Sequence, residues 1–362
     1  MTARSPIRVL LIDDSALVRM LVTRGLEADP ELEVVGAAGD VARAEVLIAS
    51  AAPDVLVLDL ELPGKDGLTF LRERMASSPV PTVVLSTHAQ TAAPRAIEAL
   101  AAGAFAALPK PTTGMLEGLP LQMTELAEQV KAAARAHRPR PRPPLRAVEG
   151  PARAMGETSK RLILVGASTG GVEALSQILP AFPADSPPIL LVQHMPAGFT
   201  RSFAARLDSL CLVQVTEAAG GDVALPGRAY LAPGGDRHLV VREERGQLLL
   251  ELEEGPPMHH LHPAVDALFQ SAARLRGRAI SAAVLTGMGR DGAAGLAALR
   301  AMGASTVAQD EASSIVFGMP GAAIALGGAG QVLDLAAIPA ALLAFPSSPR
   351  RPAQSPITRP PP

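Results

Sequence analysis

The chain has 362 residues, of which 48% are hydrophobic and 19% are charged, and its net charge is −2. This length allows about two domains, and the apolar content excludes a chain that is disordered throughout. The near-neutral charge argues against a generally basic nucleic-acid binder, and an aromatic content of 2% argues against a base-stacking surface.

The cysteine content and the hydropathy pattern bear on location. The single cysteine, Cys211, excludes an internal disulfide and a multi-cysteine metal site, and it fits a reducing cytosol. The N-terminus does not resemble a signal peptide, because the apolar run Val9–Ile12 is short and ends in two acids. No stretch reaches the length of about 18 apolar residues that a membrane span needs. We therefore expect a cytoplasmic protein without membrane insertion.

Charge divides the chain into blocks. The net charge is −7 over residues 1–130, +7 over 131–161, −5 over 162–345 and +3 over 346–362. We expect a first domain at 1–130, a basic Pro/Arg-rich linker at 131–160, a second domain at 161–345 and a disordered tail at 346–362. The prolines around His137–Pro144 favour an extended spacer. Contact of this basic segment with nucleic acid or an acidic membrane is the alternative interpretation.

In the first block, short apolar runs alternate with helical patterns. Strands are expected at Val9–Ile12, Leu32–Gly36, Asp54–Leu58, Thr82–Leu85 and Ala104–Leu108, and helices near 15–27, 41–51, 66–76, 91–102 and 115–135. This alternation predicts a parallel sheet that is covered on both faces and collects ligands at the carboxyl ends of its strands.

Polar side chains follow four of these strands. They are Asp13 and Asp14, then Asp59, Ser86 and Lys110. Carboxylates that converge at one rim repel one another unless a cation separates them, and an all-oxygen site suits Mg²⁺. Each aspartate could instead cap a helix, with Lys110 a solvated charge. Their joint position at consecutive strand ends favours a phosphoryl-transfer site, in which Lys110 and Ser86 contact the transferred phosphate.

These residues carry a resemblance to a known domain. The segments Ile12–Ser15, Leu58–Gly67 and Pro109–Pro111 resemble the receiver domain of two-component response regulators over about residues 7–128. The resemblance implies a flavodoxin-like (βα)5 fold and phosphorylation of Asp59 by a partner histidine kinase, with Asp13, Asp14 and Asp59 as metal ligands. One position departs from the family, because Ala107 stands where a switching Phe or Tyr is usual, and Phe105 has a different offset.

The second block begins a new strand–helix alternation. Strands are expected at Leu162–Val165, Ile189–Val192, Leu212–Val215, Ile280–Leu285 and Ser305–Ala308, a hairpin over 238–253, and helices near 170–179, 199–208, 263–275 and 291–302. The pattern predicts a doubly wound α/β domain with an antiparallel hairpin.

Three residues at strand ends of this block suit acyl transfer. The Gly166–Gly171 segment contains G-x-S-x-G between a strand and a helix, a pattern typical of a tight turn that exposes Ser168. A generic glycine turn or a phosphate loop is the alternative, although the Walker and Rossmann patterns are absent. His194 and Asp291 follow two other strands and could be a structural histidine and a helix cap. Together the three supply a nucleophile, a base and an orienting acid.

The second block also resembles a known family. The segments that carry the likeness are Gly166–Gly171, Gln193–Leu207, Leu225–Gly234 and Leu285–Ala293. They resemble the catalytic domain of the chemotaxis protein-glutamate methylesterase over about residues 160–345, and a preceding receiver domain is that family's architecture. The resemblance implies Ser168 as nucleophile, His194 as base and Asp291 as orienter, with Thr169 and Met288 bordering the reacting centre. It also implies hydrolysis of glutamate γ-methyl esters on methyl-accepting chemotaxis receptors, deamidation of receptor glutamines, and no cofactor for the esterase.

One segment departs from this family. His259–Asp266 stands where Arg-Pro-Ser-Val-Asp is usual, so that His262 and Ala264 replace the Arg and the Ser. The three histidines His259, His260 and His262 could alternatively belong to a metal site, although they would need further ligands from afar.

The resemblance to this family implies an esterase that is gated by phosphorylation of Asp59, with the unphosphorylated receiver domain packed over the active-site rim. Two other classes of protein are alternatives to this esterase. A DNA-binding response regulator would need a basic output face, which the net charge of the second block contradicts. A non-catalytic scaffold that acts by docking stays as the alternative.

Overall fold

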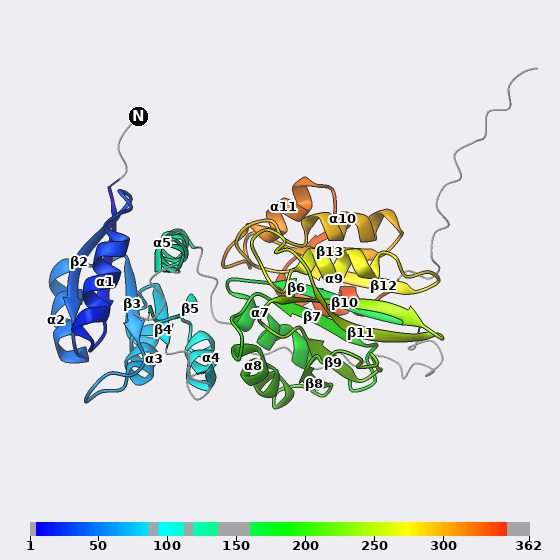
Figure 1. Cartoon of the computed structure of the whole chain (residues 1–362), viewed down its shortest axis with the longest axis horizontal. Helices are drawn as coiled ribbons and strands as arrows, with labels where there is room; N and C mark the ends of the chain where they lie inside the picture. The colour runs from blue at the N-terminus through cyan, green and yellow to red at the C-terminus, as the bar shows by residue number, and fades with distance from the viewer. Residues whose placement is uncertain (1–4, 87–92, 112–118, 137–159, 346–362) are drawn as a thin grey trace, which may run out of the picture.

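The computed structural model describes residues 5–86, 93–111, 119–136 and 160–345, which form two α/β halves side by side (Figure 1). The proline-rich segment His137–Pro144 and the tail at 346–362 lie outside the described residues, as do parts of the helices expected near 91–102 and 115–135. None of the described helices combines the length and the apolarity that a bilayer crossing requires.

The N-terminal half is built on one parallel sheet. Its strands are β1 Ile7–Ile12, β2 Leu32–Ala38, β3 Val55–Asp59, β4 Thr82–Ser86 and β5 Ala106–Pro109. They pair in the order β2-β1-β3-β4-β5, with every pair parallel. This is the flavodoxin-like order, so the predicted (βα)5 fold is confirmed.

Helices cover both faces of that sheet. They are α1 Ala16–Leu26, α2 Val41–Ala51, α3 Gly67–Ser77, α4 Ala93–Ala101 and α5 Leu119–Arg135. Alternate residues of β1 enter different cores: Val9 and Leu11 pack with residues of α1 and α5, while Leu10 and Ile12 pack with residues of α2 and α3. Because successive side chains of a strand point to opposite faces, the continuous apolar run in the sequence follows from burial on both sides.

The C-terminal half contains a larger parallel sheet. Its strands are β6 Arg161–Ala167, β7 Ile189–Gln193, β8 Gln214–Glu217, β9 Arg228–Leu231, β12 Ala279–Val284, β13 Ser305–Gln309 and β14 Gln331–Leu333, in the order β14-β13-β12-β6-β7-β9-β8. The first strand of the domain, β6, lies at the centre, and the chain winds outward from it in both directions. The predicted doubly wound arrangement is therefore confirmed.

The remaining elements cover this sheet. The helices are α7 Gly171–Ile178, α8 Phe199–Asp208, α9 Val265–Ala272, α10 Ala293–Ala301, α11 Met319–Ala325 and α12 Ile338–Leu343, with short 3-10 turns at Leu179–Ala181 and Leu335–Ala337. The predicted hairpin is present as β10 Arg237–Glu244 and β11 Gln247–Glu254, which pair antiparallel as a separate ribbon. Its inner residues Val241 and Leu250 share a core with Leu268 of α9.

Several short elements differ from the sequence prediction. The strand expected at Leu212–Val215 is β8, two residues later, because Leu212 is exposed and does not pair. Strands β9 and β14 and helices α11 and α12 have no counterpart in the prediction. These elements span only three to seven residues, which is too short for a clear hydrophobic period.

Candidate active site and candidate phosphorylation site

Ser168 lies on a tight turn between β6 and α7. The turn passes through Gly170, whose φ of 80° is in the left-handed region that favours glycine. The N–H of Gly171 donates to the carbonyl of Ser168 at 2.7 Å, and the N–H of Ser168 donates to the carbonyl of Thr286 at 3.1 Å. These bonds fix the serine at the carboxyl ends of the central strands.

Neighbouring segments pack closely against the serine. A Cβ atom at Gly287 would lie 2.8 Å from the Cβ of Ser168, so only glycine fits there. The side-chain amide of Gln193 donates to the carbonyl oxygens of Ser168 at 2.9 Å and of His194 at 3.0 Å. The amide thereby joins the serine turn to the end of β7, where His194 begins the next loop.

His194 and Asp291 form a buried pair. The Nε2 atom of His194 lies 2.8 Å from Oδ2 of Asp291, and the two side chains are 8% and 0% exposed. The Nδ1 atom of His194 is buried and has no hydrogen-bond partner among the described residues. A histidine that donates from Nε2 presents Nδ1 as an acceptor, and no hydrogen bond joins this nitrogen to Ser168.

The electrostatics of Asp291 suit an ionised acid. Its Oδ2 also accepts from the N–H of Val265 at 2.6 Å, and its Oδ1 accepts from the N–H of Asp266 and of Gly292, both at 2.9 Å. Burial raises the pKa of Asp291, but the hydrogen bond and charge of His194 and the backbone donors outweigh burial, so that the pKa is lowered overall. Asp291 caps the start of α9 rather than the helix that follows it, because the N-cap of α10 is Gly292.

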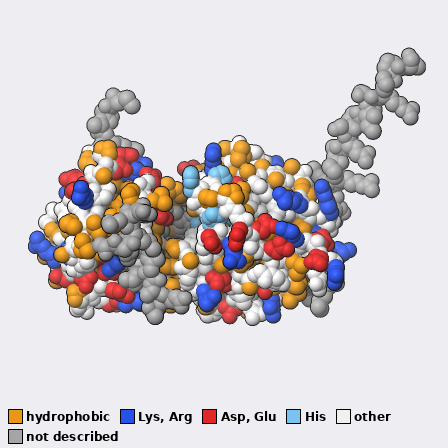
Figure 2. Space-filling model, in the orientation of Figure 1, with side chains coloured by type: hydrophobic (Ala, Val, Ile, Leu, Met, Phe, Trp, Pro, Cys, Tyr) orange, Lys and Arg blue, Asp and Glu red, His pale blue; other side chains and the backbone are white. Residues whose placement is uncertain are grey.

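A cavity of about 400 Å³ opens at this site between the two halves. Ser168, Thr169 and His194 line it from the C-terminal half, and Phe105 and Ala107 line it from the N-terminal half. Met288, the other expected border residue, lies outside the cavity lining, in the loop between β12 and α10 that also carries Asp291. Figure 2 shows histidine side chains gathered on the edge of the C-terminal half that faces the N-terminal half.

The acidic residues of the N-terminal half gather at one rim of its sheet. Asp13, Asp14 and Asp59 each offer a carboxylate oxygen, and these oxygens lie within 4.8 Å of one another. The Nζ atom of Lys110 lies 2.5 Å from Oδ2 of Asp59 and 3.2 Å from Oδ2 of Asp13. Ser86 is buried at the end of β4, and its carbonyl accepts from the N–H of Lys110 at 2.8 Å. All five predicted residues are therefore at this rim.

The donor set of this rim fits a divalent cation. The three aspartate oxygens lie within reach of one ion, and Asp14 is exposed. Water can therefore complete the coordination shell of oxygen atoms that a hard divalent cation requires. Burial is the main cause that raises the pKa of Asp59, against the hydrogen bond from Lys110. Burial lowers the pKa of Lys110, but its hydrogen bond to Asp59 and the charges of both aspartates raise it overall, which favours the ammonium form.

The histidine-rich segment has its own contacts. His262 donates from Nε2 to the carbonyl of Gly255 at 2.9 Å, and its ring lies 4.5 Å from that of His238. Ala264 is buried and donates its N–H to Nδ1 of His238 at 3.1 Å. Among the described residues, the three neighbouring histidines do not form a shared metal cluster, since only His259 joins one, with Asp266 and Asp291.

Two residues of this site, Gln193 and Asp266, had no predicted role, and His259 was considered only as a possible metal ligand. All three lie within segments that carry the family likeness or its departure. The available signals were the amide next to His194 and the acid in the fourth position of the helix predicted near 263–275. Both are common in ordinary helices and loops, so the local sequence gives no role to either.

The fold defines a protein of two α/β halves, one with three aspartates and a lysine at its sheet rim and the other with Ser168 and the His194–Asp291 pair at its own rim. The family model described as CheB methylesterase matches residues 163–342, and the model described as response regulator receiver domain matches residues 9–116. A protein of Cereibacter sphaeroides named protein-glutamate methylesterase/protein-glutamine glutaminase 2 is 51% identical, over 93% of this chain and 91% of its own. The protein of Anaeromyxobacter dehalogenans with the same name and the number 5 is 48% identical, over 94% and 97%.

A solved structure is also similar. The crystal structure of the Thermotoga maritima CheB methylesterase catalytic domain is 39% identical, covers 50% of this chain and 96% of that chain, and has a TM-score of 0.49. From the curated relatives, the chain belongs to the protein-glutamate methylesterase/protein-glutamine glutaminase family, with a receiver domain preceding the methylesterase domain.

Proposed function

We propose that this protein hydrolyses glutamate γ-methyl esters on methyl-accepting chemotaxis receptors, releasing methanol, and deamidates receptor glutamines. The observation that carries this proposal is the buried His194–Asp291 pair, which lies at the same rim as the Ser168 turn. The names of the relatives that match nearly the whole chain supply the substrate class. Both reactions are acyl transfers at a γ-carbonyl and differ only in the leaving group.

The residues suggest a reaction in two halves. The hydroxyl oxygen of Ser168 attacks the γ-carbonyl carbon while Nδ1 of His194 takes the hydroxyl proton, and the imidazolium then protonates the leaving group, which departs as methanol from the ester or as ammonia from the glutamine amide. In the second half, water loses a proton to His194 and attacks the acyl-serine, and His194 returns that proton to the departing serine oxygen, which releases glutamate and restores Ser168. Asp291 holds the ring and stabilises its charged form. We propose no cofactor for the esterase, because these three side chains and water account for each proton.

The N-terminal domain is proposed to take a phosphoryl group on Asp59 from a partner histidine kinase. Asp13, Asp14 and Asp59 would hold Mg²⁺, which supplies positive charge to the transferred group. Lys110 and Ser86 would contact phosphate oxygens from the ends of β5 and β4. The single cysteine, which fits a reducing compartment, and the proposed histidine kinase partner suggest a cytoplasmic location.

Helix α4 offers a route from this site to the esterase. It packs against α7 and α8 of the other half (Figure 1). Its residues Ala93, Ala96 and Ile97 belong to the core cluster that contains Phe199 and Phe203 of α8, whereas Ala99 belongs to a core of the N-terminal half. One helix therefore contributes apolar contacts to both domains. We propose that this docked arrangement restricts substrate access and that phosphorylation favours an undocked state.

Arg95 connects α4 to the phosphorylation rim. Its guanidinium donates to the carbonyl of Leu60 at 3.3 Å and forms an ion pair with Asp66. Leu60 directly follows Asp59, so a change at the phosphoacceptor would reach α4 through this contact. Since Ala107 has no aromatic ring to switch, we propose that Arg95 couples the rim to the docking helix.

A methanol-release assay on methylated receptors, with and without a small-molecule phosphodonor, tests the proposal. We expect basal release from the wild-type protein and a faster rate with the donor. If the wild type released no methanol in either condition, the esterase proposal would fall, and the alternative of a scaffold that acts by docking would gain support.

A further inference from the structure

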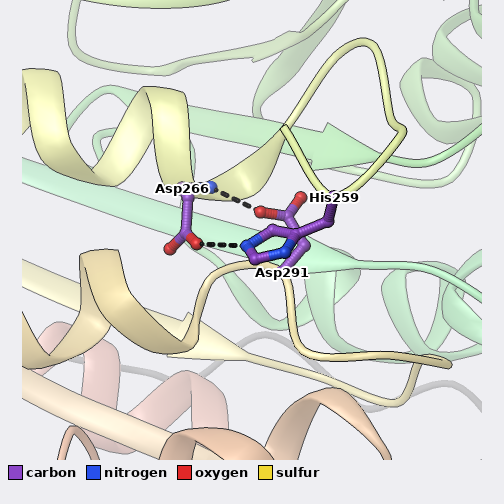
Figure 3. A group of neighbouring side chains, drawn as sticks. All are labelled: His259, Asp266 and Asp291. Carbon is purple, nitrogen blue, oxygen red and sulfur yellow. Dashed lines mark hydrogen bonds and ion pairs between the residues drawn. The ribbon is translucent and has the colours of Figure 1, made fainter. Parts of the chain in front are cut away.

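Asp266 is a buried acid that contacts the catalytic acid through its backbone. It is the second residue of α9 and is 1% exposed. Its N–H donates to Oδ1 of Asp291 at 2.9 Å, and its own carboxylate oxygens face two other segments. Figure 3 shows Asp266 beside Asp291, with His259 reaching Asp266 from the preceding loop. The orientation of the Asp266 backbone therefore bears directly on the position of Asp291.

One carboxylate oxygen of Asp266 holds the start of α10. Its Oδ1 accepts from the N–H of Gly295 at 2.6 Å, which is a first-turn donor without an acceptor inside its own helix. A Cβ atom at Gly295 would lie 2.5 Å from the Cβ of Phe269 and 3.1 Å from that oxygen, so glycine allows the two helices to approach. Because α10 begins two residues after Asp291, the hydrogen bond from Gly295 to Asp266 also fixes the loop that carries Asp291.

The other carboxylate oxygen of Asp266 is held by His259. Its Oδ2 lies 3.0 Å from Nε2 of His259. His259 and His260 are the central residues of a two-residue turn, closed by the bond from the N–H of Leu261 to the carbonyl of Met258 at 2.9 Å. Both have positive φ, 53° and 64°, a turn that favours Asn and Gly. Histidine adopts it at a conformational cost, and the bond to Asp266 compensates for that cost.

The buried carboxylates of Asp266 and Asp291 need the hydrogen-bond donors that surround them. Burial raises the pKa of Asp266, and the neighbouring charge of Asp291 raises it further. Each acid is paired with one imidazole, His194 for Asp291 and His259 for Asp266. Backbone N–H groups at the starts of α9 and α10 supply further hydrogen bonds. These hydrogen bonds account for the arrangement without a metal ion.

We propose that Asp266 is a positioning residue for the esterase reaction, which holds Asp291 in line with His194, and that His259 in turn holds Asp266. The inference rests on the proposed function and adds to it two residues that touch neither substrate nor the reacting atoms. It also gives the histidine-rich departure from the family pattern a role in the site, through its first histidine.

A double-mutant cycle separates positioning from a general structural role. The variants are Asp266→Asn, Asp291→Asn and the two combined, assayed by methanol release from methylated receptor. In the otherwise wild-type protein, Asp266→Asn should lower kcat about tenfold or more with little change in KM. In the Asp291→Asn background the same change should lower kcat less than about twofold, since the residue that it positions is already lost. An equal fall in both backgrounds, or an unchanged kcat in the first, would overturn the proposal.

A second variant and a matched control protect the test against misfolding. His259→Gln changes a partly exposed side chain and should lower kcat about threefold, again only when Asp291 is present. If circular dichroism shows that Asp266→Asn does not fold, the His259→Gln cycle decides, and equal falls in both backgrounds overturn the proposal. The control is Asp208→Asn, which alters a carboxylate that accepts from the N–H of Val215 at 2.7 Å, away from the cavity. It should leave kcat unchanged.

A measurement without substrate distinguishes this inference from the proposed function. The proton between Nε2 of His194 and Asp291 should give a downfield proton resonance in the wild-type protein. We expect it to move or broaden in Asp266→Asn and His259→Gln and to stay in place in Asp208→Asn. An unmoved resonance in both test variants would refute positioning. If the wild type released no methanol, the esterase function would fail while this resonance would still report on the role of Asp266.

Discussion

Replacing Ile97 with glutamate tests whether the N-terminal domain restrains the active site. Ile97 is 2% exposed on α4 and belongs to the apolar core cluster of the C-terminal half. In the docked arrangement the introduced carboxylate would be buried among apolar side chains. Once the domains separate, the same group would be solvated, so the substitution penalises only the docked state.

The magnitude follows from the buried side chain. Full burial of an isoleucine contributes about 1.5–3 kcal/mol, and a buried carboxylate without a partner adds a further penalty. Since about 1.4 kcal/mol corresponds to a factor of ten, the lost apolar contact alone shifts the equilibrium toward the undocked state about 10- to 150-fold. The gain in activity is limited by the fraction of wild-type protein that is docked.

The assay is methanol release by the unphosphorylated protein. Ile97→Glu should raise the basal rate about tenfold or more, and a phosphodonor should add little to it. The matched control is Val46→Glu, the same chemical change at a 57% exposed position on α2, which should leave the basal rate unchanged. If folded Ile97→Glu protein kept the wild-type rate and its full response to phosphodonor, the docking of α4 would not be inhibitory, and the proposed gating would be refuted.

Four further outcomes are expected. Ser168→Ala should lower kcat by roughly a thousandfold or more, because triad members act as a unit, and near-normal turnover would rule out its role as nucleophile. Asp59→Asn should abolish Mg²⁺-dependent labelling by a phosphodonor, so that surviving label would indicate another acceptor. Removal of residues 1–135 should raise basal methanol release, whereas a lower rate would show that the domain is needed for activation. Desolvation raises the pKa of the partly exposed Cys211 thiol to about 12, so alkylation at pH 8 should be slow in the native protein and fast in urea, and equal rates would contradict the raised pKa.

The same thiol predicts a pH dependence of stability. The pKa of Cys211 is higher in the folded protein than the value of about 8.5 for a free thiol. The folded state therefore retains a proton that the unfolded state loses, and the contribution to the free energy of unfolding is present below about pH 8.5 and declines as the pH rises toward 12. Urea unfolding of the wild type and of Cys211→Ser between pH 8 and pH 11 measures it, and parallel curves would contradict the expectation.

The sequence by itself determined the two α/β units and the polar side chains that stand at the ends of their strands. Continuous apolar runs such as Val9–Ile12 can be read locally, because a strand buried on both faces needs apolar side chains at every position. The carboxyl ends of parallel strands meet at one rim, so Asp59 and Lys110 could be brought together without coordinates. The same reasoning placed Ser168, His194 and Asp291 at one edge, where the structure has the last two in a hydrogen bond across 97 positions of sequence.

Only the tertiary structure decided which groups hold these residues in place. The local pattern suggests Asp291 as a cap for its own helix, yet it accepts from the start of α9. The roles of Gln193 and Asp266 depend on hydrogen bonds to residues that are remote in sequence or belong to another turn. The sequence pattern of α4 predicts an ordinary amphipathic helix, although in the structure its apolar face packs into the core of the other domain. The hydrophobic periodicity of a sequence indicates that a side chain is buried. Which residues bury it depends on how elements that are distant in the sequence pack together.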